Sequence, residues 1–385
     1  MKLGAAFSAT AIVACSITLS ASGTPAAPSF TAITAGFAHT CAITRAGGAK
    51  CWGGNPYGEL GNGGGPLSTA FTPVDVKGLK SGVGAIAAGG QHTCAVTRAG
   101  AAKCWGENRV GQAGRAATPT GRTPVPVNVA RLGAGVRAIA AGSQHTCAVT
   151  GSGGVKCWGA GYASGSTTPT STPVDVAGLA GGVTAIVAGR DQTCVRTSVG
   201  GVKCWGWNIN GQLGNGTTTY SYTPVDVVGL TSGVRSIAAG ASFTCAVTSG
   251  GAAKCWGWNE SGQLGNGSRS VYPGTTPVDV TGLTSGVSAI TAGAHHTCAL
   301  TSGGGVKCWG SSVFGQLGNG SRKDSNTPVN VVGLTSGVRA IAAGESHTCA
   351  LMRGGGVRCW GRNYGRLGNG SNTELSTKPV AVRVR

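Results

Sequence analysis

The sequence predicts an all-β protein, a seven-bladed β-propeller with four-stranded antiparallel blades and one intrablade disulfide per blade. The first observation is a unit of about fifty residues that recurs seven times, which is close to the length of a four-stranded propeller blade and too long for leucine-rich or ankyrin repeats. The second is a pair of cysteines, separated by nine residues, in every unit. The third is a composition with 71 Gly and few of the residues that favour helices.

Each unit contains four segments that predict short strands, as the third unit illustrates. Residues 136–142 (VRAIAAG) predict a strand whose alternating positions place mostly apolar side chains on both faces, as expected of a strand packed on two sides. Residues 145–150 (HTCAVT) and 155–159 (VKCWG) flank a glycine-rich turn. Residues 173–176 (PVDV) predict the last strand, with Pro173 at its first position, where a missing N–H costs least.

A glycine-rich loop joins the third and fourth strands of most units. It reads GQLGNG in residues 211–216, 262–267 and 315–320, and its glycines and Asn-Gly step favour a tight reversal. The second unit departs from this pattern at residues 111–116 (GQAGRA), and the third unit has no such loop between residues 159 and 173. We therefore expect remodelled loops in the second and third blades.

Strand pairing predicts the disulfides. If Thr44 and Gly48 flank the turn between the second and third strands, Cys41 faces Cys51 across the hairpin, close to the separation that a disulfide requires. The same pairing in all units links Cys41 to Cys51, Cys94 to Cys104, Cys147 to Cys157, Cys194 to Cys204, Cys245 to Cys255, Cys298 to Cys308 and Cys349 to Cys359. Seven repeated pairs indicate an oxidising compartment, and the absence of a C-x₂-C pattern argues against structural zinc.

The N-terminal segment predicts export. Residues 1–22 have a lysine, an apolar stretch and small residues, as in a secretory signal peptide, so we expect a linker at residues 23–30 and the propeller at residues 31–385. Alternatively, residues 12–15 (IVAC) resemble a bacterial lipoprotein signal, in which Cys15 would become a lipid anchor. Either outcome places the ring outside the cytoplasm, secreted or anchored at the cell surface.

Three recurring pieces, G-x-x-H-T-C-A-V-T, V-K-C-W-G-x-N and G-Q-L-G-N-G, resemble the regulator of chromosome condensation repeat family. The resemblance covers residues 30–385 and implies a seven-bladed propeller. Members of this family include a nucleotide exchange factor for a nuclear GTPase that also contacts chromatin, light sensors, enzyme-fused modules and secreted bacterial inhibitors. The resemblance therefore leaves two alternatives open: an inhibitor of an extracellular enzyme, and a guanine nucleotide exchange factor. The predicted export argues against the second, because an exported chain could not reach a nuclear GTPase.

The charge balance suggests an anionic partner. Thirty Lys and Arg against eleven Asp and Glu give a net charge of +19, which attracts polyanions and steers anionic proteins. Part of the excess is periodic, because a cation precedes the second cysteine of every unit. This cation ring comprises Lys50, Lys103, Lys156, Lys203, Lys254, Lys307 and Arg358. The alternative is that these side chains pack their stems between blades and only their charged ends reach solvent.

Nothing in the sequence predicts an enzyme. Four of the eleven acidic residues, Asp75, Asp175, Asp226 and Asp279, occupy the same strand position in different units and cannot approach one another as an acid and base pair. Five histidines precede a Thr-Cys step in the same way, which predicts a role in anchoring blades. The glycine-rich loops lack the lysine of a phosphate-binding loop, so we expect no catalytic residue, no metal and no cofactor.

Positions that differ among the units are the better candidates for partner binding, because the ring does not dictate them. Trp207 and Trp258 occupy a slot that holds other residues elsewhere, and further aromatic and basic residues lie in the loops of units four to seven. The candidates are Trp207, Tyr220, Tyr222, Trp258, Arg269, Tyr272, Phe314, Arg322, Lys323 and Tyr364. Aromatic and basic side chains on variable loops are typical of binding hot spots. The alternative is that they are loop tips without a partner.

The sequence thus predicts a non-catalytic, extracytoplasmic binding scaffold that recognises a macromolecular or anionic partner through its loop face. We expect a protein or polyanionic partner, with only unspecific nucleic acid binding, contact with a membrane only through lipid at Cys15, and a monomeric ring. The last strand, at residues 379–384, should either dock beside the first blade or complete the seventh blade next to it.

Overall fold

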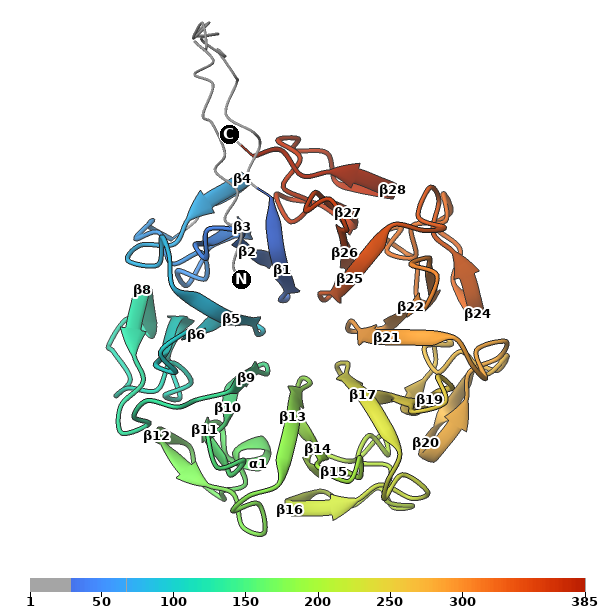
Figure 1. The fold of residues 1–385 in the computed structure, drawn as a ribbon, viewed down its shortest axis with the longest axis horizontal. Coiled ribbons are helices and arrows are strands. Elements are labelled where there is room, and N and C mark those ends of the chain that lie inside the picture. Colours follow the sequence, from blue (N-terminus) through green and yellow to red (C-terminus); the bar gives the residue numbers. More distant parts are fainter. Residues whose placement is uncertain (1–28, 67, 385) are drawn as a thin grey trace, which may run out of the picture.

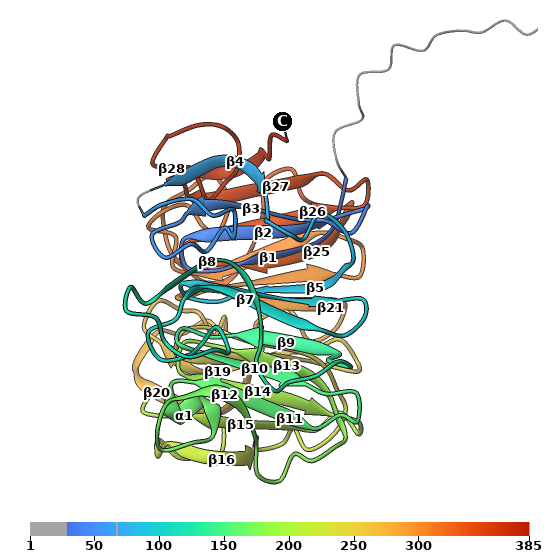
Figure 2. The ribbon, with the colours of Figure 1, turned by 90° about the vertical axis from the view of Figure 1, so that its left-hand side faces the viewer.

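The computed structural model describes residues 29–66 and 68–384, which form seven four-stranded antiparallel sheets arranged around a central axis (Figure 1). Seen from the side, the ring is a thick disc (Figure 2). The predicted propeller is therefore confirmed. The predicted signal peptide, the alternative lipid anchor Cys15 and most of the predicted linker lie outside the described residues.

Four consecutive strands build each blade, from the axis outward. Blade one comprises β1 (Phe30–Ala35), β2 (His39–Thr44), β3 (Ala49–Gly54) and β4 (Thr69–Asp75). Blade two comprises β5 (Val83–Ala88), β6 (His92–Thr97), β7 (Ala102–Glu107) and β8 (Arg122–Asn128). Blade three comprises β9 (Ala138–Ala141), β10 (His145–Val149), β11 (Val155–Gly159) and β12 (Thr170–Asp175), with the short helix α1 (Gly161–Ser164) before its last strand.

The remaining blades repeat this order. Blade four comprises β13 (Val183–Ala188), β14 (Gln192–Thr197), β15 (Val202–Gly206) and β16 (Ser221–Asp226), and blade five comprises β17 (Val234–Ala239), β18 (Phe243–Thr248), β19 (Ala253–Asn259) and β20 (Ser270–Asp279). Blade six comprises β21 (Val287–Ala292), β22 (His296–Thr301), β23 (Val306–Gly310) and β24 (Ser325–Asn330). Blade seven comprises β25 (Val338–Ala343), β26 (His347–Met352), β27 (Val357–Arg362) and β28 (Leu375–Ala381).

The predicted hairpin register and disulfides are confirmed. In blade one, Thr44 N–H donates to the Gly48 carbonyl at 2.8 Å, and Cys41 lies directly opposite Cys51. All seven predicted cysteine pairs are disulfides within one blade. The fourteen sulfurs belong to residues that are 0% exposed, so each bridge is part of the core of its blade.

The outer strand of blade three corrects one detail of the sequence analysis. Strand β12 begins at Thr170, so Pro173 lies inside the strand and not at its first position. Its register against β11 shifts between Cys157 and Gly159. An irregular edge strand tolerates a proline because the missing N–H is not needed by a neighbouring strand. The inner strand β9 is also shorter than predicted, since Val136 and Arg137 lie before it.

Neighbouring blades are joined by a repeated set of buried polar contacts. In blade two, Thr93 Oγ1 and Trp105 Nε1 both donate to the Glu59 carbonyl of blade one, at 2.8 and 2.7 Å. His39 Nε2 of blade one lies 2.8 Å from the same Thr93 oxygen. Because that hydroxyl donates its own proton to the carbonyl, it accepts from His39, which fixes the neutral Nε2–H form. The predicted anchoring role of the histidines is thus confirmed.

The same set of contacts closes the ring between blades seven and one. His347 Nε2 lies 2.8 Å from Thr40 Oγ1, and Trp52 Nε1 donates to the Arg366 carbonyl at 2.9 Å. Strand β28 pairs with β27, so the second of the two predicted arrangements is correct and the last strand completes blade seven. At the other end, Phe30 is 2% exposed and already belongs to β1. The propeller therefore begins before residue 31, the boundary that the sequence predicted.

Candidate functional site

Two sets of loops share one face of the disc. The loops between the first and second strands of each blade surround the axis, and the loops between the third and fourth strands lie outside them. Backbone hydrogen bonds tie the two sets together, as when Trp207 N–H donates to the Asp191 carbonyl at 2.8 Å and Arg362 N–H to the Ser346 carbonyl at 2.8 Å. We call this side of the ring the loop face. It carries all the partner-binding residues that the sequence predicted.

Four aromatic rings meet on the loop face where blades three and four adjoin. The ring centroid of Tyr162 lies 5.2 Å from that of Tyr222, 5.5 Å from that of Tyr220 and 5.7 Å from that of Trp207. Tyr162 and Tyr220 are 42% and 49% exposed. The structure thus brings three of the predicted residues together and adds Tyr162. We call these four residues the aromatic cluster.

The aromatic cluster depends on the departure of blade three from the repeat. Where other blades have the glycine-rich loop, blade three has helix α1, which contains Tyr162 and ends at Gly165 with a positive φ of 75°. This helix contacts strands β14, β15 and β16 of the next blade, so its tyrosine reaches the aromatic residues of blade four. Sequence reasoning noted the missing loop and did not consider the tyrosine that replaces it.

The other predicted residues form separate contacts further round the ring. The Arg362 guanidinium lies over the rings of Phe314, at 4.7 Å, and Tyr364, at 5.4 Å, which joins blades six and seven. Arg269 of blade five lies 3.6 Å from Asp324 of blade six, and Arg322 Nε donates to the Val313 carbonyl.

Three predicted residues remain outside these contacts. Tyr272 is 80% exposed, Lys323 is exposed and Trp258 is partly buried. The predicted residues are therefore several small groups on one face and not a single patch.

The predicted cation ring does not form an uncompensated band of charge. Each lysine faces the last residue of the outer strand, and four lysines form ion pairs: Lys50 with Asp75, Lys156 with Asp175, Lys203 with Asp226 and Lys254 with Asp279, at 2.6 to 2.8 Å. Lys103 and Lys307 donate to Asn128 and Asn330, whereas Arg358 lies opposite Ala381. These side chains lie near the hairpin end of their strands, away from the loop face. The pairing favours the packing alternative and gives the repeated aspartates a structural role.

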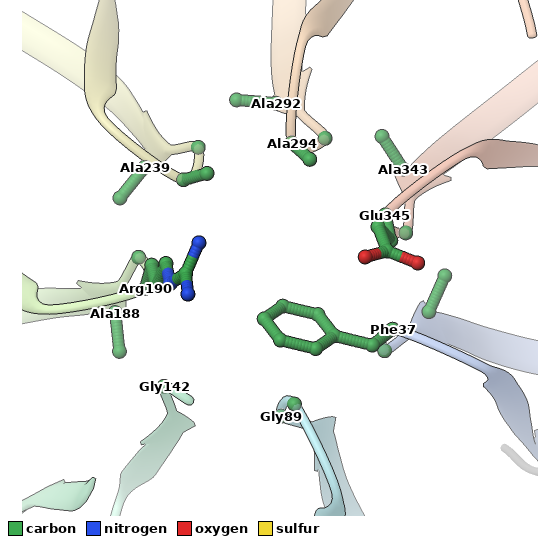
Figure 3. Close-up of a pocket in the computed structure, with 18 of the residues that line it drawn as sticks. Phe37, Gly89, Gly142, Ala188, Arg190, Ala239, Ala292, Ala294, Ala343 and Glu345 are labelled. Carbon is green, nitrogen blue, oxygen red and sulfur yellow. The ribbon is translucent and has the colours of Figure 1, made fainter. Parts of the chain in front are cut away.

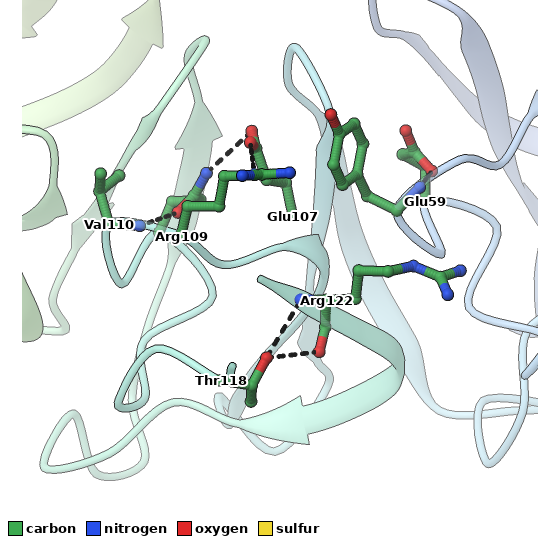
Figure 4. A network of polar contacts seen from close by, with 8 residues as sticks. Glu59, Glu107, Arg109, Val110, Thr118 and Arg122 are labelled. Atoms are coloured by element: carbon green, nitrogen blue, oxygen red, sulfur yellow. Dashed lines mark hydrogen bonds and ion pairs between the residues drawn. The ribbon is translucent and has the colours of Figure 1, made fainter. Parts of the chain in front are cut away.

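Glu59 of blade one and Glu107 of blade two are buried acidic residues that lie near arginines (Figure 4). Glu59 stands where the loops of four other blades have glutamine, and its Oε2 accepts from Tyr57 N–H at 2.8 Å, as Gln112 Oε1 accepts from Val110 N–H. Burial raises the pKa of Glu59 to about 7, against the lowering effect of backbone N–H groups and of Arg122. Arg122 extends toward Glu59 in Figure 4. Glu59 is therefore largely protonated below neutral pH.

Replacing Glu59 by glutamine, the residue that four other blades have at this position, should stabilise the ring at alkaline pH. The pKa of Glu59 is raised from 4.5 to about 7 on folding, so its contribution to stability is complete below pH 4.5 and is lost as the pH rises through 7. We expect Glu59→Gln to raise the free energy of unfolding by roughly 1 to 3 kcal/mol at pH 8.5, and by much less at pH 5. Urea unfolding at the two pH values measures this, with the exposed Glu374→Gln as control. A variant that is less stable at pH 8.5 would show that the ionised carboxylate is held by Arg122.

The axial end of the loop face opens into a cavity lined mainly by alanine and glycine (Figure 3). Three larger side chains reach into it: Phe37 from blade one, Arg190 from blade four and Glu345 from blade seven (Figure 3). They occupy equivalent positions, directly after a ring-lining glycine, where the other blades have Gly90, Ser143, Ala241 and Ala294. We call Phe37, Arg190 and Glu345 the axial group. The sequence analysis did not single them out, although their departure from the repeat was visible.

The described residues contain no group of three or more His, Cys, Asp or Glu side chains placed to hold a metal ion. Within the same residues, no helix has both the length and the apolar character needed to cross a bilayer. The five buried histidines belong to five different blades, and each contacts a threonine of the next blade. The loop face itself carries exposed aromatic rings and a few charges.

A closed ring of seven similar four-stranded blades defines a class of protein, the β-propellers. Within that class the chain belongs to the regulator of chromosome condensation (RCC1) repeat family. One model of this repeat matches residues 51–96, 103–149, 200–247, 255–300 and 304–351. A second matches residues 30–59, 85–112, 136–163, 234–263, 287–316 and 338–366. The resemblance seen in the sequence is thus confirmed.

Relatives with this repeat include regulators and receptors of different kinds. The chain is 33% identical over 349 residues to the ultraviolet-B receptor UVR8 of Arabidopsis thaliana, covering 89% of this chain and 67% of the receptor. It is 31% identical over 335 residues to the mitochondrial RCC1 domain-containing protein RUG3 of the same plant, covering 86% of this chain and 65% of that protein. It is 36% identical over 156 residues to the human ubiquitin ligase HERC2, covering 40% of this chain and 3% of the ligase.

Solved structures show the same fold at lower identity. Prp20p of Saccharomyces cerevisiae, whose binding to Gsp1p and histones has been characterised, superposes with a TM-score of 0.77 at 22% identity and covers 93% of this chain. The match includes 88% of Prp20p. Human WBSCR16 also has a TM-score of 0.77, at 23% identity, with 88% of this chain and 94% of that protein covered. The relatives together support a binding or regulatory scaffold.

Proposed function

We propose that this chain is a non-catalytic, extracytoplasmic scaffold that binds a protein partner through its loop face, with the aromatic cluster at the centre of the contact. The observation that carries the proposal is the convergence of Tyr162, Trp207, Tyr220 and Tyr222 from two blades. Tyrosine and tryptophan dominate binding hot spots because they bury a large apolar area at a small cost in conformational entropy. Seven disulfides and the apolar N-terminal stretch support a location outside the cytoplasm.

A protein partner agrees better with the loop face than a polyanion does. The periodic lysines lie toward the other end of the strands, and four of them are already paired with aspartate. The net charge of +19 remains and would accelerate association with an acidic protein. It does not by itself supply the apolar contacts that a lasting complex needs. A secreted inhibitor of an enzyme would be one form of such a scaffold, and nucleotide exchange would require a GTPase in the same compartment.

Affinity capture from the native medium or envelope, followed by quantitative binding of the captured protein, tests the proposal. We expect Trp207→Ala to weaken binding by at least about tenfold, because truncation of a central aromatic residue removes a hot spot. Trp258→Ala is the matched variant, since the Trp258 N–H bonds to the loop of its own blade as the Trp207 N–H does. Trp258 lies outside the aromatic cluster, so its truncation should change the affinity much less. Circular dichroism and thermal unfolding would confirm that both variants fold.

Salt dependence separates the two kinds of partner. A complex built on aromatic contacts should lose only a fewfold in affinity between about 0.05 and 0.5 M NaCl, whereas a polyanion complex should lose a hundredfold or more. Unchanged affinity in Trp207→Ala, or a loss of binding at high salt, would contradict the proposal. Either result would indicate that the positive net charge dominates binding.

A further inference from the structure

The axial group differs from its surroundings in both size and charge. Of the described residues that line the axial cavity, most are alanine or glycine, and Arg190 and Glu345 are the charged ones. The cavity itself measures about 90 Å³ and opens to solvent, so a ligand larger than a few water molecules lies partly in its mouth. The other four blades have small residues at the equivalent positions. Closing the ring therefore does not require a cation, an anion and an aromatic side chain there.

The backbone of the axial group is already engaged in holding the ring together. Phe37 N–H donates to the Gly89 carbonyl at 3.3 Å, Arg190 N–H to the Gly240 carbonyl at 3.3 Å and Glu345 N–H to the Gly36 carbonyl at 3.2 Å. Each bond links neighbouring blades. The loops that carry the three side chains are therefore held in place by backbone hydrogen bonds. The Phe37 ring, the Arg190 guanidinium and the Glu345 carboxylate remain available to a ligand in the cavity.

The two charges of the axial group are held apart. Arg190 comes from blade four and Glu345 from blade seven, on opposite sides of the axis (Figure 3). Within the described part of the chain, the ion pair recorded for Arg190 is with Asp191, at 3.6 Å between two side chains that are 62% and 51% exposed, and such a pair contributes little. The ring of Phe37 projects between the two charges in Figure 3. The cavity therefore has a positive wall, a negative wall and an apolar surface between them.

We propose that the axial cavity binds a short zwitterionic peptide, of two or three residues, with its carboxylate at Arg190 and its ammonium group at Glu345. Guanidinium groups bind carboxylates through paired hydrogen bonds, and a carboxylate accepts from an ammonium group. The apolar side chain of the peptide would lie against Phe37. A free amino acid carries both charges on one carbon, whereas each added residue extends the span between them by roughly 3.3 to 3.6 Å. The longer ligand suits two charged side chains on opposite sides of the axis (Figure 3).

Isothermal titration of the purified full-length chain with the dipeptide Ala-Phe tests this assignment. We expect binding with a Kd of roughly 0.1 to 1 mM, the range for a ligand of this size. N-acetyl-Ala-Phe and Ala-Phe-amide each lack one charge and should bind at least about tenfold more weakly. Wild-type chain that shows no heat with Ala-Phe at 10 mM, or that binds the blocked peptides equally well, would overturn the proposal.

Charge variants place the peptide in the cavity. Arg190→Gln and Glu345→Gln should each lower the affinity for Ala-Phe at least about tenfold, while Arg137→Gln and Glu374→Gln remove the same charges from exposed positions elsewhere and should leave it unchanged. The double variant Arg190→Glu with Glu345→Arg should recover binding, because the peptide can reverse its direction. Failure of the double variant to recover, with thermal unfolding like that of the wild type, would contradict the assigned orientation. The proposal does not depend on the aromatic cluster, so Trp207→Ala should bind Ala-Phe normally.

Discussion

Reduction of the seven disulfides is expected to unfold the ring at temperatures where the oxidised protein is stable. Each bridge joins cysteines ten positions apart, for which the chain-entropy model gives somewhat under 3 kcal/mol. The sum over seven blades exceeds the 5 to 15 kcal/mol that is typical of the net stability of a protein. We expect the reduced chain to melt at least roughly 20 °C below the oxidised chain, as measured by circular dichroism after reduction in denaturant and refolding in an excess of reductant.

A single-blade variant provides the scale for this effect. Replacing both Cys245 and Cys255 by alanine removes one buried bridge and should cost about 2 to 3 kcal/mol without unfolding the ring. Peptide mapping of the non-reduced protein checks the pairing itself. Free thiols, links between different blades, or a reduced protein that melts like the oxidised one would contradict the contribution assigned to the bridges.

Mild acid is expected to destabilise the ring through its buried histidines. Burial lowers the pKa of His39 and His145 to about 3 and that of His92 to about 4. His296 behaves in the same way, with a pKa of about 3, and the pKa of His347 is also well below its usual value. Each of these side chains donates from Nε2 to a threonine in the neutral form, so a proton added at Nδ1 would be buried without compensation.

The direction of the effect follows from the two states. In the unfolded chain these histidines titrate near 6.5, so below that pH the unfolded state binds more protons and stability falls. The loss continues until the pKa of the folded state is reached, at about 3 to 4. Each histidine should remove on the order of 1 to 2 kcal/mol between pH 7 and pH 5. Glu59, Glu107 and Asp191, whose pKa values burial raises, act in the opposite direction, but the five buried histidines outnumber them.

Urea unfolding between pH 7.5 and pH 5 measures how steeply the free energy of unfolding falls with pH. A natural replacement for the histidine occurs within the chain. In blade four, Gln192 replaces the histidine and donates to the Gly240 and Phe243 carbonyls. His92→Gln should therefore fold and should show a shallower loss of stability in acid than the wild type. His295→Gln is the comparison variant: His295 is exposed, although partial burial also lowers its pKa, so its replacement should change the slope less than His92→Gln. Equal slopes for wild type and His92→Gln would mean that the buried histidines do not set the acid sensitivity.

The fold could be predicted from the sequence because its determinants are local and repeated. Cys41 and Cys51 face each other across one turn, and the same spacing recurs in every unit. The register of one hairpin therefore predicts all seven disulfides. The errors concern irregular positions. Pro173 lies within its strand because the outer strand is bulged, and Phe30 belongs to β1 because its side chain fills the junction with blade seven.

The site was less predictable because it depends on contacts between blades. Trp207, Tyr220 and Tyr222 were found as departures from the repeat, but only the geometry brings Tyr162 beside them. The aspartates opposite the lysines could have been paired from the register of the hairpins, since Lys50 and Asp75 follow directly from it. The axial group draws on blades one, four and seven, and no local pattern joins residues that are more than a hundred positions apart.

Because the four strands of a blade are consecutive in the chain, each sheet can assemble from a segment that leaves the ribosome or a translocation pore as one piece. Among the fourteen cysteines of the described residues, the partner of the first cysteine in each pair is the next one to emerge, so oxidation of these cysteines in the order of synthesis yields the native bridges without reshuffling. The bond from His347 to Thr40 is different, since its two ends are separated by 307 positions. Its formation must wait for the whole polypeptide, which makes the meeting of the first and last sheets the final step of maturation.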